Sequence, residues 1–479
     1  MAGPHSTQWA AGRQIPPPWL WALALGMGSV LWVVGWRVQA GAALERSIMG
    51  SLPPPRDVLI SLYRAAVAAA HPSNLLTAEM LPPRTRGRTL VVGAGKPAGA
   101  MAQAFEAAWP HPCEGLVVTQ YGYRPPTASI EVIEANHPIP DQASVTAGRR
   151  ILDLVGSAGA EDLIIALIAG GGSALLCLPA PGITLAHKQE MFRALLGSGA
   201  PIMEMNRVRR AMSAVKGGRL AAAAGDTPLA TYMLSDVPGD DAATIGGGPT
   251  VPCPEDGAAA LEVIARYALP ATAALGKAIR ANKAPPALGG ARSLHMIATP
   301  ATALKAAEAR AREWGIEVDN LGDLIEGEAR DVARDMARRV RQRCGHAGSM
   351  ARRPWVLISG GETTVTLDGP GRGRARARGQ GVGRGGRNTE FLLALALELD
   401  GADRVHALAC DTDGIDGTED NAGAVIGPDI LGRARVKGLD GRALLGDHDA
   451  YSFFADLDAL VVTGPTFTNV NDFRAILVT

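Results

Sequence analysis

The stretch that most constrains the fold runs through residues 162–176, where an apolar segment of strand length ends in three glycines and a serine. An apolar run without polar alternation is typical of a strand buried on both faces of a parallel sheet. Because glycine has no Cβ, the turn that follows can point successive backbone N–H groups at one anion. Gly171, Gly172 and Ser173 are therefore predicted to bind substrate or phosphate at the carboxyl end of a strand.

A cation-rich segment, residues 206–219, comes next. If it is helical, Arg209, Ser213 and Lys216 fall on one face, and Gly217 ends the helix near Lys216. Two cations and a hydroxyl on one face suit a multiply charged oxyanion, so Arg209 and Lys216 are also predicted to bind substrate or phosphate. A solvated basic face explains this segment alone equally well.

An acidic loop, SDVPGDD at residues 235–241, follows the next predicted strand, and a second glycine turn comes shortly after it. Carboxylates at a strand end beside a phosphate-binding turn commonly hold Mg²⁺. Asp236 is therefore a predicted metal ligand and Asp240 a predicted catalytic residue. Taken singly, Asp240 or Asp241 is better explained as part of a polar turn.

Residues 89–105 predict strand, glycine turn and helix, the opening unit of a doubly wound sheet. The glycine spacing is a weak dinucleotide signal, and the strand at residues 115–120 ends without the acidic residue that NAD recognition needs. Lys96 starts the helix, where a cation is unfavourable beside the positive end of the helix dipole. We expect Lys96 to face an anion, with a plain surface lysine as the alternative.

Strands and helices alternate again from Ser293, after a linker candidate at residues 283–290. A Gly/Arg-rich segment runs into Arg387 and Asn388, which begin a leucine-rich helix whose N-terminus favours an anion. Two loops follow later strands: DTDGIDG at residues 411–417, which contains Asp413, and a Gly/Thr/Asn turn that contains Asn469. The first is no calcium loop, since alanine stands where the terminal glutamate is needed.

These patterns predict an α/β protein of two domains, with the active site in the cleft between them. Residues 51–285 are predicted to form a Rossmann-like parallel-sheet domain and residues 291–479 a smaller α/β domain. With 47 basic and 47 acidic residues the chain is formally neutral, which argues against nucleic acid or an anionic membrane as partner. The five cysteines form no Cys-x-x-Cys pair, so they provide no zinc site and indicate a reducing compartment.

Taken together, the loops closely resemble those of the glycerate 2-kinase family, with its C-terminal MOFRL module, whose members are often labelled hydroxypyruvate reductases. The motifs that carry the resemblance are GGGSALL (170–176), NRVRR (206–210), KGGRL (216–220), SDVPGDD (235–241), SGGETTV (359–365), GGRNTE (385–390), TDGIDG (412–417) and GPTFTNVND (464–472). The resemblance runs from about residue 55 to the end, in order.

The resemblance implies phosphorylation of D-glycerate at its 2-hydroxyl, with ATP and Mg²⁺, giving 2-phosphoglycerate. Lys96 and Arg387 match the family's proposed catalytic lysine and arginine, and Asn388 and Asn469 lie in matching substrate loops. Asp236, Asp240 or Asp413 would orient Mg²⁺ or take the hydroxyl proton, and we assign Asp236 and Asp413 to the metal. The partners implied are glycerate and ATP, and a homodimer is an open alternative to a monomer.

The sequence departs from the family pattern in a few places. Ala169 and Gly247 stand where serines are usual, Pro97 where alanine is common, and residues 372–382 look inserted beside Arg387. These changes bear on substrate affinity and loop closure rather than on the class of reaction.

Three other functions compete with the kinase. A nicotinamide-dependent hydroxypyruvate reductase lacks its acidic residue, and a hydrolase with Ser173 as nucleophile lacks the final glycine of G-x-S-x-G, since Leu175 stands there. A sugar-acid binding protein without turnover is the third alternative.

Residues 1–50 form an N-terminal extension outside the family pattern, with an uncharged apolar run at residues 19–36. This run is at the short end for a membrane span. It is a single anchor, a signal peptide, or a segment that is absent because translation starts later, for example at Met49. An ATP-using enzyme favours a cytoplasmic location, with membrane contact only if residues 19–36 are retained.

Overall fold

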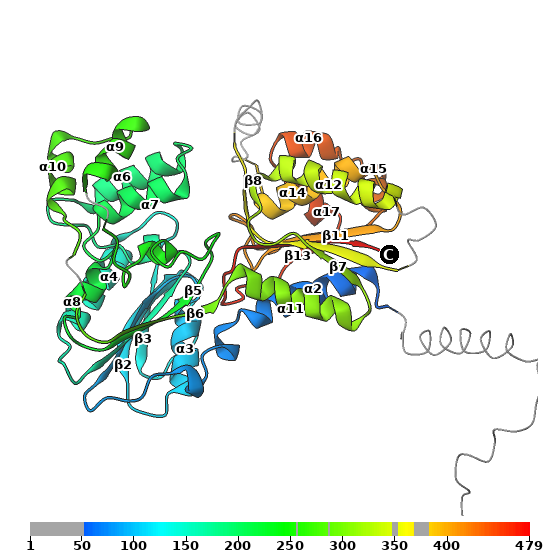
Figure 1. The fold of residues 1–479 in the computed structure, drawn as a ribbon. Coiled ribbons are helices and arrows are strands. Elements are labelled where there is room, and N and C mark those ends of the chain that lie inside the picture. Colours follow the sequence, from blue (N-terminus) through cyan, green and yellow to red (C-terminus); the bar gives the residue numbers. More distant parts are fainter. Residues whose placement is uncertain (1–51, 255–256, 286–287, 347–352, 368–382) are drawn as a thin grey trace, which may run out of the picture. The chain divides into compact units, whose positions relative to one another are not determined.

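The computed structural model describes residues 52–254, 257–285, 288–346, 353–367 and 383–479 (Figure 1). The N-terminal apolar run and the Gly/Arg insertion at residues 372–382 therefore lie outside the described residues. Residues Pro53–Thr479 make one compact unit. Among the helices of the described ranges, none combines the length and apolar character that a membrane crossing requires.

The first sheet is a six-stranded parallel sheet in the order β3-β2-β1-β4-β5-β6. This order is that of a doubly wound dinucleotide-type fold, so the predicted Rossmann-like class is confirmed. The apolar run at residues 163–169 is its central strand β4, which is buried along its whole length. The strands are β1 (Thr89–Ala94), β2 (Glu114–Gln120), β3 (Ile130–Ala135), β4 (Leu163–Ala169), β5 (Leu229–Leu234) and β6 (Arg292–Ala298).

Helices α3 and α4 pack against this sheet, and four further helices gather in a separate apolar cluster that contains Met191, Val208 and Ile264. The described helices of this part are α3 (Ala98–Ala108), α4 (Gln142–Gly156), α5 (Gly172–Leu175), α6 (Leu185–Leu196), α7 (Ile202–Ala211), α8 (Arg219–Ala223), α9 (Gly257–Arg266) and α10 (Ala273–Ala281), with 3-10 turns η1 (Pro72–Asn74), η2 (Ala78–Met80) and η3 (Ile245–Gly247).

The prediction of one helix through residues 206–219 is wrong. α7 ends at Ala211, and α8 begins only at Arg219. The amide of Asn282 donates to the backbone oxygens of Ala211 and Ser213, at 2.9 Å each, and Ser213 also bridges to Pro179. These tertiary hydrogen bonds replace the helical ones, so Arg209, Ser213 and Lys216 do not share a helix face.

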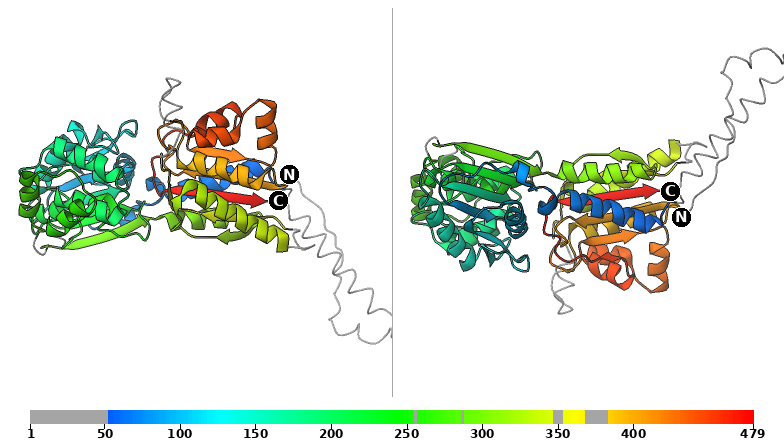
Figure 2. Two further views of the ribbon diagram at one scale, coloured as in Figure 1. Left: turned by 90° about the horizontal axis from the view of Figure 1, so that it is seen from above. Right: turned by 90° about the horizontal axis from the view of Figure 1, so that it is seen from below.

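The second sheet is mixed and runs in the order β13-β12-β11-β14-β9-β7. Helices α2 and α11 pack on one face, and α12 and α14 on the other (Figures 1 and 2). The elements are α2 (Pro55–Ala69), α11 (Pro300–Glu313), β7 (Glu317–Asn320), β8 (Glu326–Glu328), α12 (Ala329–His346), β9 (Trp355–Ser359), β10 (Glu362–Thr364), α14 (Arg387–Leu399), β11 (Val405–Asp411), β12 (Gly423–Ile426), α15 (Ile430–Val436), α16 (Gly441–Gly446), α17 (Ala450–Asp456), β13 (Leu460–Val461) and β14 (Asp472–Val478).

Two elements differ from the predicted domain boundaries at residues 285 and 291. β6 pairs in parallel with β5, so it completes the first sheet instead of opening the second domain. α2 comes first in the described chain, yet it packs against α11, β11 and β14 of the second sheet. The apolar face of α2, with Leu59 and Leu62 fully buried, finds its partner there.

Candidate active site

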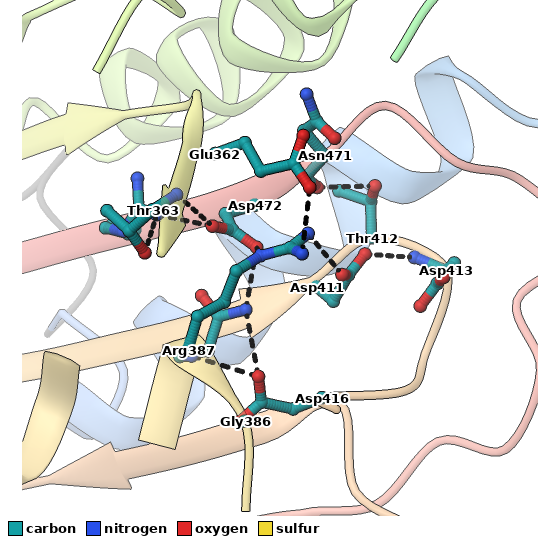
Figure 3. A network of polar contacts seen from close by, with 12 residues as sticks. Glu362, Thr363, Gly386, Arg387, Asp411, Thr412, Asp413, Asp416, Asn471 and Asp472 are labelled. Atoms are coloured by element: carbon teal, nitrogen blue, oxygen red, sulfur yellow. Dashed lines mark hydrogen bonds and ion pairs between the residues drawn. The ribbon is translucent and has the colours of Figure 1, made fainter. Parts of the chain in front are cut away.

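Arg387, the first residue of α14, is held by three carboxylates (Figure 3). Its Nε donates to Asp472 at 2.7 Å, its Nη2 to Asp411 at 2.8 Å and its Nη1 to Glu362 at 3.0 Å. Burial alone lowers the pKa of Arg387, but Asp472 and Glu362 outweigh it and raise the pKa well above its ordinary value. The guanidinium is therefore permanently charged and fixed in direction.

The N-terminus of α14, which we predicted to receive an anion, is filled by this chain's own Asp416 (Figure 3). Its carboxylate accepts from the backbone N–H groups of Asn388 at 2.9 Å and Thr389 at 2.8 Å. Asn388 is fully buried, and its amide donates to Asp472 at 2.8 Å. Asn388 is thus tied to two of the acidic residues, and substrate binding by this side chain stays a prediction.

Lys96 follows β1 and reaches the loop after β11. Its Nζ pairs with Asp413 Oδ2 at 2.5 Å, and its backbone N–H donates to Gly170 O at 2.8 Å. Burial alone would lower the pKa of Lys96, but Asp413 and Asp411 raise it above the ordinary value. Lys96 in turn keeps the pKa of Asp413 low, against the effect of burial. The pair is therefore ionised.

Lys96 and Arg387 contact the same loop, since their partners Asp413 and Asp411 are two residues apart. Asp413 N–H donates to Asp411 Oδ1 at 3.1 Å (Figure 3). Two tyrosines hold this loop from outside it. Tyr63 donates to Asp411 O at 2.9 Å, and Tyr123 donates to Asp413 O at 3.1 Å. Residues from both sheets thus fix one acidic loop between two cations.

The glycine turn after β4 packs so closely against Asp236, Asn469 and Lys96 that a side chain on the turn would collide with them. A Cβ at Gly170 would lie 1.9 Å from Asp236 Oδ2 and 2.8 Å from Asn469 Nδ2. A Cβ at Gly171, whose φ is +77°, would lie 3.1 Å from Lys96 Cγ. The turn requires glycine because its backbone packs directly against the side chains of Lys96 and Asp236.

Asp236, two residues after the end of β5, is a buried carboxylate whose pKa is raised towards neutrality. Burial, with Glu362 adding to it, raises its pKa to about 7, while Lys96 and Arg387 act in the opposite direction. Asn469 Nδ2 donates to Asp236 Oδ2 at 3.2 Å, and Asn471 Nδ2 donates to its backbone oxygen at 2.5 Å. A carboxylate poised at this pKa can accept a proton at physiological pH.

The remaining predicted residues lie in other surroundings. Asp240 has a left-handed φ of 56°. Burial raises the pKa of Asp240, and the charge of Asp323 raises it further. Lys216 is fully buried and donates to Leu176 O at 2.7 Å, and Arg209 stacks on Phe192 at 4.6 Å from the ring centroid. Within the described ranges, no hydrogen bond or ion pair joins any of these three with Lys96 or Arg387.

The predicted metal ligands do not form a cation cage by themselves. Asp413 has one oxygen on Lys96 and the other on Ile415 N–H at 2.9 Å. Within the described ranges, no cluster of three or more His, Cys, Asp or Glu could hold a metal ion. Because Asp413 pairs with Lys96, Asp236 is the predicted ligand whose carboxylate remains for Mg²⁺ or for a proton.

Several residues of the site were missed from the sequence. Asp411, Asp472 and Glu362 orient Arg387, and Tyr123 and Asn471 join the two sheets. A signal was present for Asp411 and Asp472, since Asp411 opens the acidic loop after a predicted strand and Asp472 ends the GPTFTNVND motif. Nothing in the local pattern marked Tyr123.

The fold and the site together define an α/β protein of two sheets in which a lysine and an arginine pair with carboxylates of one acidic loop. The MOFRL family model matches residues 355–472, and the model described as "Domain of unknown function (DUF4147)" matches residues 58–280. The chain belongs to the glycerate 2-kinase family.

Individual relatives and a solved structure are similar to this chain over most of its length. A D-glycerate 2-kinase of Thermotoga maritima is 33% identical over 87% of this chain and 97% of its own length. The crystal structure of glycerate kinase from Thermotoga maritima matches with a TM-score of 0.75 and 32% identity, covering 88% of this chain and 99% of that chain. A protein of Agrobacterium vitis named putative hydroxypyruvate reductase is 47% identical over 88% of this chain and 94% of its own length.

Proposed function

We propose that this protein is a D-glycerate 2-kinase, which transfers the terminal phosphoryl group of ATP to the 2-hydroxyl of D-glycerate. The observation that carries the proposal is the convergence of Lys96, Arg387 and Asp236. Two fixed cations lie beside a carboxylate that titrates near neutrality, with a glycine turn beneath. Because ATP is a cytoplasmic substrate, we place the enzyme in the cytoplasm.

The residues have separable roles in such a transfer. Lys96 and Arg387 neutralise charge on the transferred phosphoryl group, which requires positioning and electrostatics more than covalent chemistry. Asp236 accepts the proton of the 2-hydroxyl, and this role replaces the metal role first assigned to it. Asp240 is then left as a loop residue. Asp411, Asp472 and Glu362 keep the Arg387 guanidinium aimed.

Mg²⁺ bound with ATP would be held mainly by phosphate oxygens, which are its usual ligands in phosphoryl-transfer sites. The ion supplies charge neutralisation of the phosphate oxygens. The acidic residues around Arg387 outnumber the cations there, which favours a ligand that arrives with a divalent cation.

The test is incubation of the purified protein with D-glycerate and Mg-ATP, with the product read by ³¹P NMR. A phosphate on the 2-oxygen, formed together with ADP, supports the proposal. A phosphate on the 3-oxygen would keep the kinase and reject the position. No ADP above that of a Lys96→Met control would reject the kinase.

The reductase is the second candidate, because two Agrobacterium vitis relatives at 47% and 48% identity carry that name. Against it, β2 ends at Gln120, where nicotinamide recognition through the ribose needs an acidic residue. Incubation with hydroxypyruvate and NADH or NADPH, followed by absorbance, distinguishes the two activities directly.

A further inference from the structure

Three cations on different elements act on one another, and no carboxylate of the described residues pairs with them. Lys188 comes from α6, Arg209 from α7 and Lys216 from the loop before α8. Burial is the main cause that lowers the pKa of each, and for Lys216 the charges of Lys188 and Arg209 lower it further. The mutual repulsion shows that the three charges act on one another.

The hydrogen-bonding capacity of this group is not used up. Lys188 is fully buried, and in the described part of the chain its Nζ has no hydrogen-bond partner beyond the weak acceptor offered by the Cys177 thiol. Nε of Arg209 is also buried and without a partner in the described part of the chain. Lys216 Nζ donates one hydrogen bond within the described part of the chain, to Leu176 O at 2.7 Å. A buried lysine without a partner is costly, so such groups are usually paired with an anion.

No carboxylate of the described residues supplies that anion. None of the ion pairs in the described ranges includes any of the three cations. Among the described residues, the Cys177 thiol is the acidic group that raises the pKa of Lys188 and Lys216, against the effect of burial. Arg209, which is partly exposed, connects the group to solvent.

We propose that Lys188, Arg209 and Lys216 form a binding site for a phosphate-class oxyanion, which completes the hydrogen bonds of Lys188 Nζ and Arg209 Nε. Three cations match a multiply charged phosphate better than a single carboxylate. The inference rests on the proposed function for the source of that phosphate, which is either the nucleotide or the phosphorylated product.

The location supports this assignment. A Cβ at Gly247 would lie 2.7 Å from Lys216 Cδ, and Gly172 lies beside Gly246, so the two glycine turns meet next to the cations. The charges of both Arg209 and Lys96 act on His137, whose pKa burial and these charges lower to about 3. His137 is therefore neutral and feels the charges of both Arg209 and Lys96.

The test compares the full-length wild type with Lys188→Met, which keeps the side-chain volume and removes the charge. Thermal unfolding is measured with and without inorganic phosphate, and ADP, 2-phosphoglycerate and D-glycerate are titrated by calorimetry. We expect Lys188→Met to unfold at a higher temperature than the wild type without ligand, since an unpaired buried charge is removed. We expect the stabilisation by phosphate to be lost and the Kd of ADP or 2-phosphoglycerate to rise roughly tenfold or more.

Arg209→Gln is the second variant, because Arg209 is partly exposed and its loss threatens folding least. Lys305→Met, at an exposed lysine of α11, is the matched control and should change nothing. ADP and 2-phosphoglycerate distinguish the two sources of phosphate. Unchanged stabilisation by phosphate in both variants, or a loss confined to D-glycerate, would overturn the proposal. Phosphate binding is measured without turnover, so its outcome does not depend on kinase activity. If the wild type does not phosphorylate glycerate, and Lys188→Met still loses phosphate binding, the proposed kinase function is rejected and the phosphate site is supported.

Discussion

Lys96 and Asp413 form an ion pair of 2.5 Å between the loop after β1 of the first sheet and the loop after β11 of the second. The Asp413 carboxylate is almost fully buried, and Lys96 retains 18% exposure of its side chain. The pair therefore has a structural role, in holding the acidic loop, and it also presents a cation that a ligand can reach. The predictions below separate these two roles.

Replacing Lys96 by Met should remove activity and also destabilise the protein, because Asp413 is left as an unpaired buried charge. We expect kcat to fall by about 100-fold or more and the free energy of unfolding to fall by about 3 kcal/mol. The double variant Lys96→Met/Asp413→Asn should regain most of the stability and none of the activity. Denaturant unfolding and ADP release measure the two effects. Activity that returns with stability would show that Lys96 is only structural.

Replacing Asp236 by Asn should lower kcat/KM by roughly 100-fold and remove the rising limb of its pH profile. In the wild type that limb should have an apparent pKa near 7, the value to which burial raises Asp236. A profile with the same limb in Asp236→Asn would assign the titration to another group.

The same variant has a defined effect on stability. An aspartate in the unfolded chain titrates near about 4. The folded protein therefore holds the Asp236 proton more tightly between pH 4 and 7, and the stability from this group is lost as the pH rises through 7. Asp236→Asn should match the wild type at low pH and become relatively more stable towards pH 8. Melting temperatures at several pH values check the sign.

Replacing Gly170 by Ala should lower kcat/KM by about tenfold or more, because the new Cβ would lie 1.9 Å from Asp236 Oδ2 and must displace it. Gly432→Ala is the matched control, since a Cβ there meets nothing within 4 Å. The control lies in α15, where alanine favours the helix, so it should be neutral or slightly stabilising. Wild-type kinetics in Gly170→Ala would mean that Asp236 need not stay where the structure places it.

Replacing Asp416 by Ala should destabilise the protein by about 2 kcal/mol, since two backbone N–H groups of α14 lose their buried acceptor. Asp403→Ala, at an exposed aspartate, serves as control and should cost nothing measurable. Because Arg387 begins the same helix, KM or kcat should also worsen in Asp416→Ala. A stability loss without any kinetic change would uncouple the helix end from the site.

How far the sequence reaches can be judged from particular elements. The apolar run of β4 predicted a central parallel strand because local hydrophobicity decides burial there, and the prediction is confirmed. The helix through residues 206–219 failed because Asn282, far along the chain, takes over the hydrogen bonds of Ala211 and Ser213. The anion expected at the N-terminus of α14 is Asp416, whose role depends on how a distant loop folds back. Contacts of this kind leave no local periodicity.

The placement of α2 and β6 sets limits on dissecting this protein. The first described helix, α2, packs on the second sheet. The chain then forms the six strands of the first sheet, and after β6 it continues into the elements of the second sheet. A recombinant fragment that starts at residue 291 would include β6 without β5 and would leave uncovered the face of β11 and β14 on which α2 packs. Neither half is thus a separable module, and two fragments supplied in trans would have to exchange elements before either core closed.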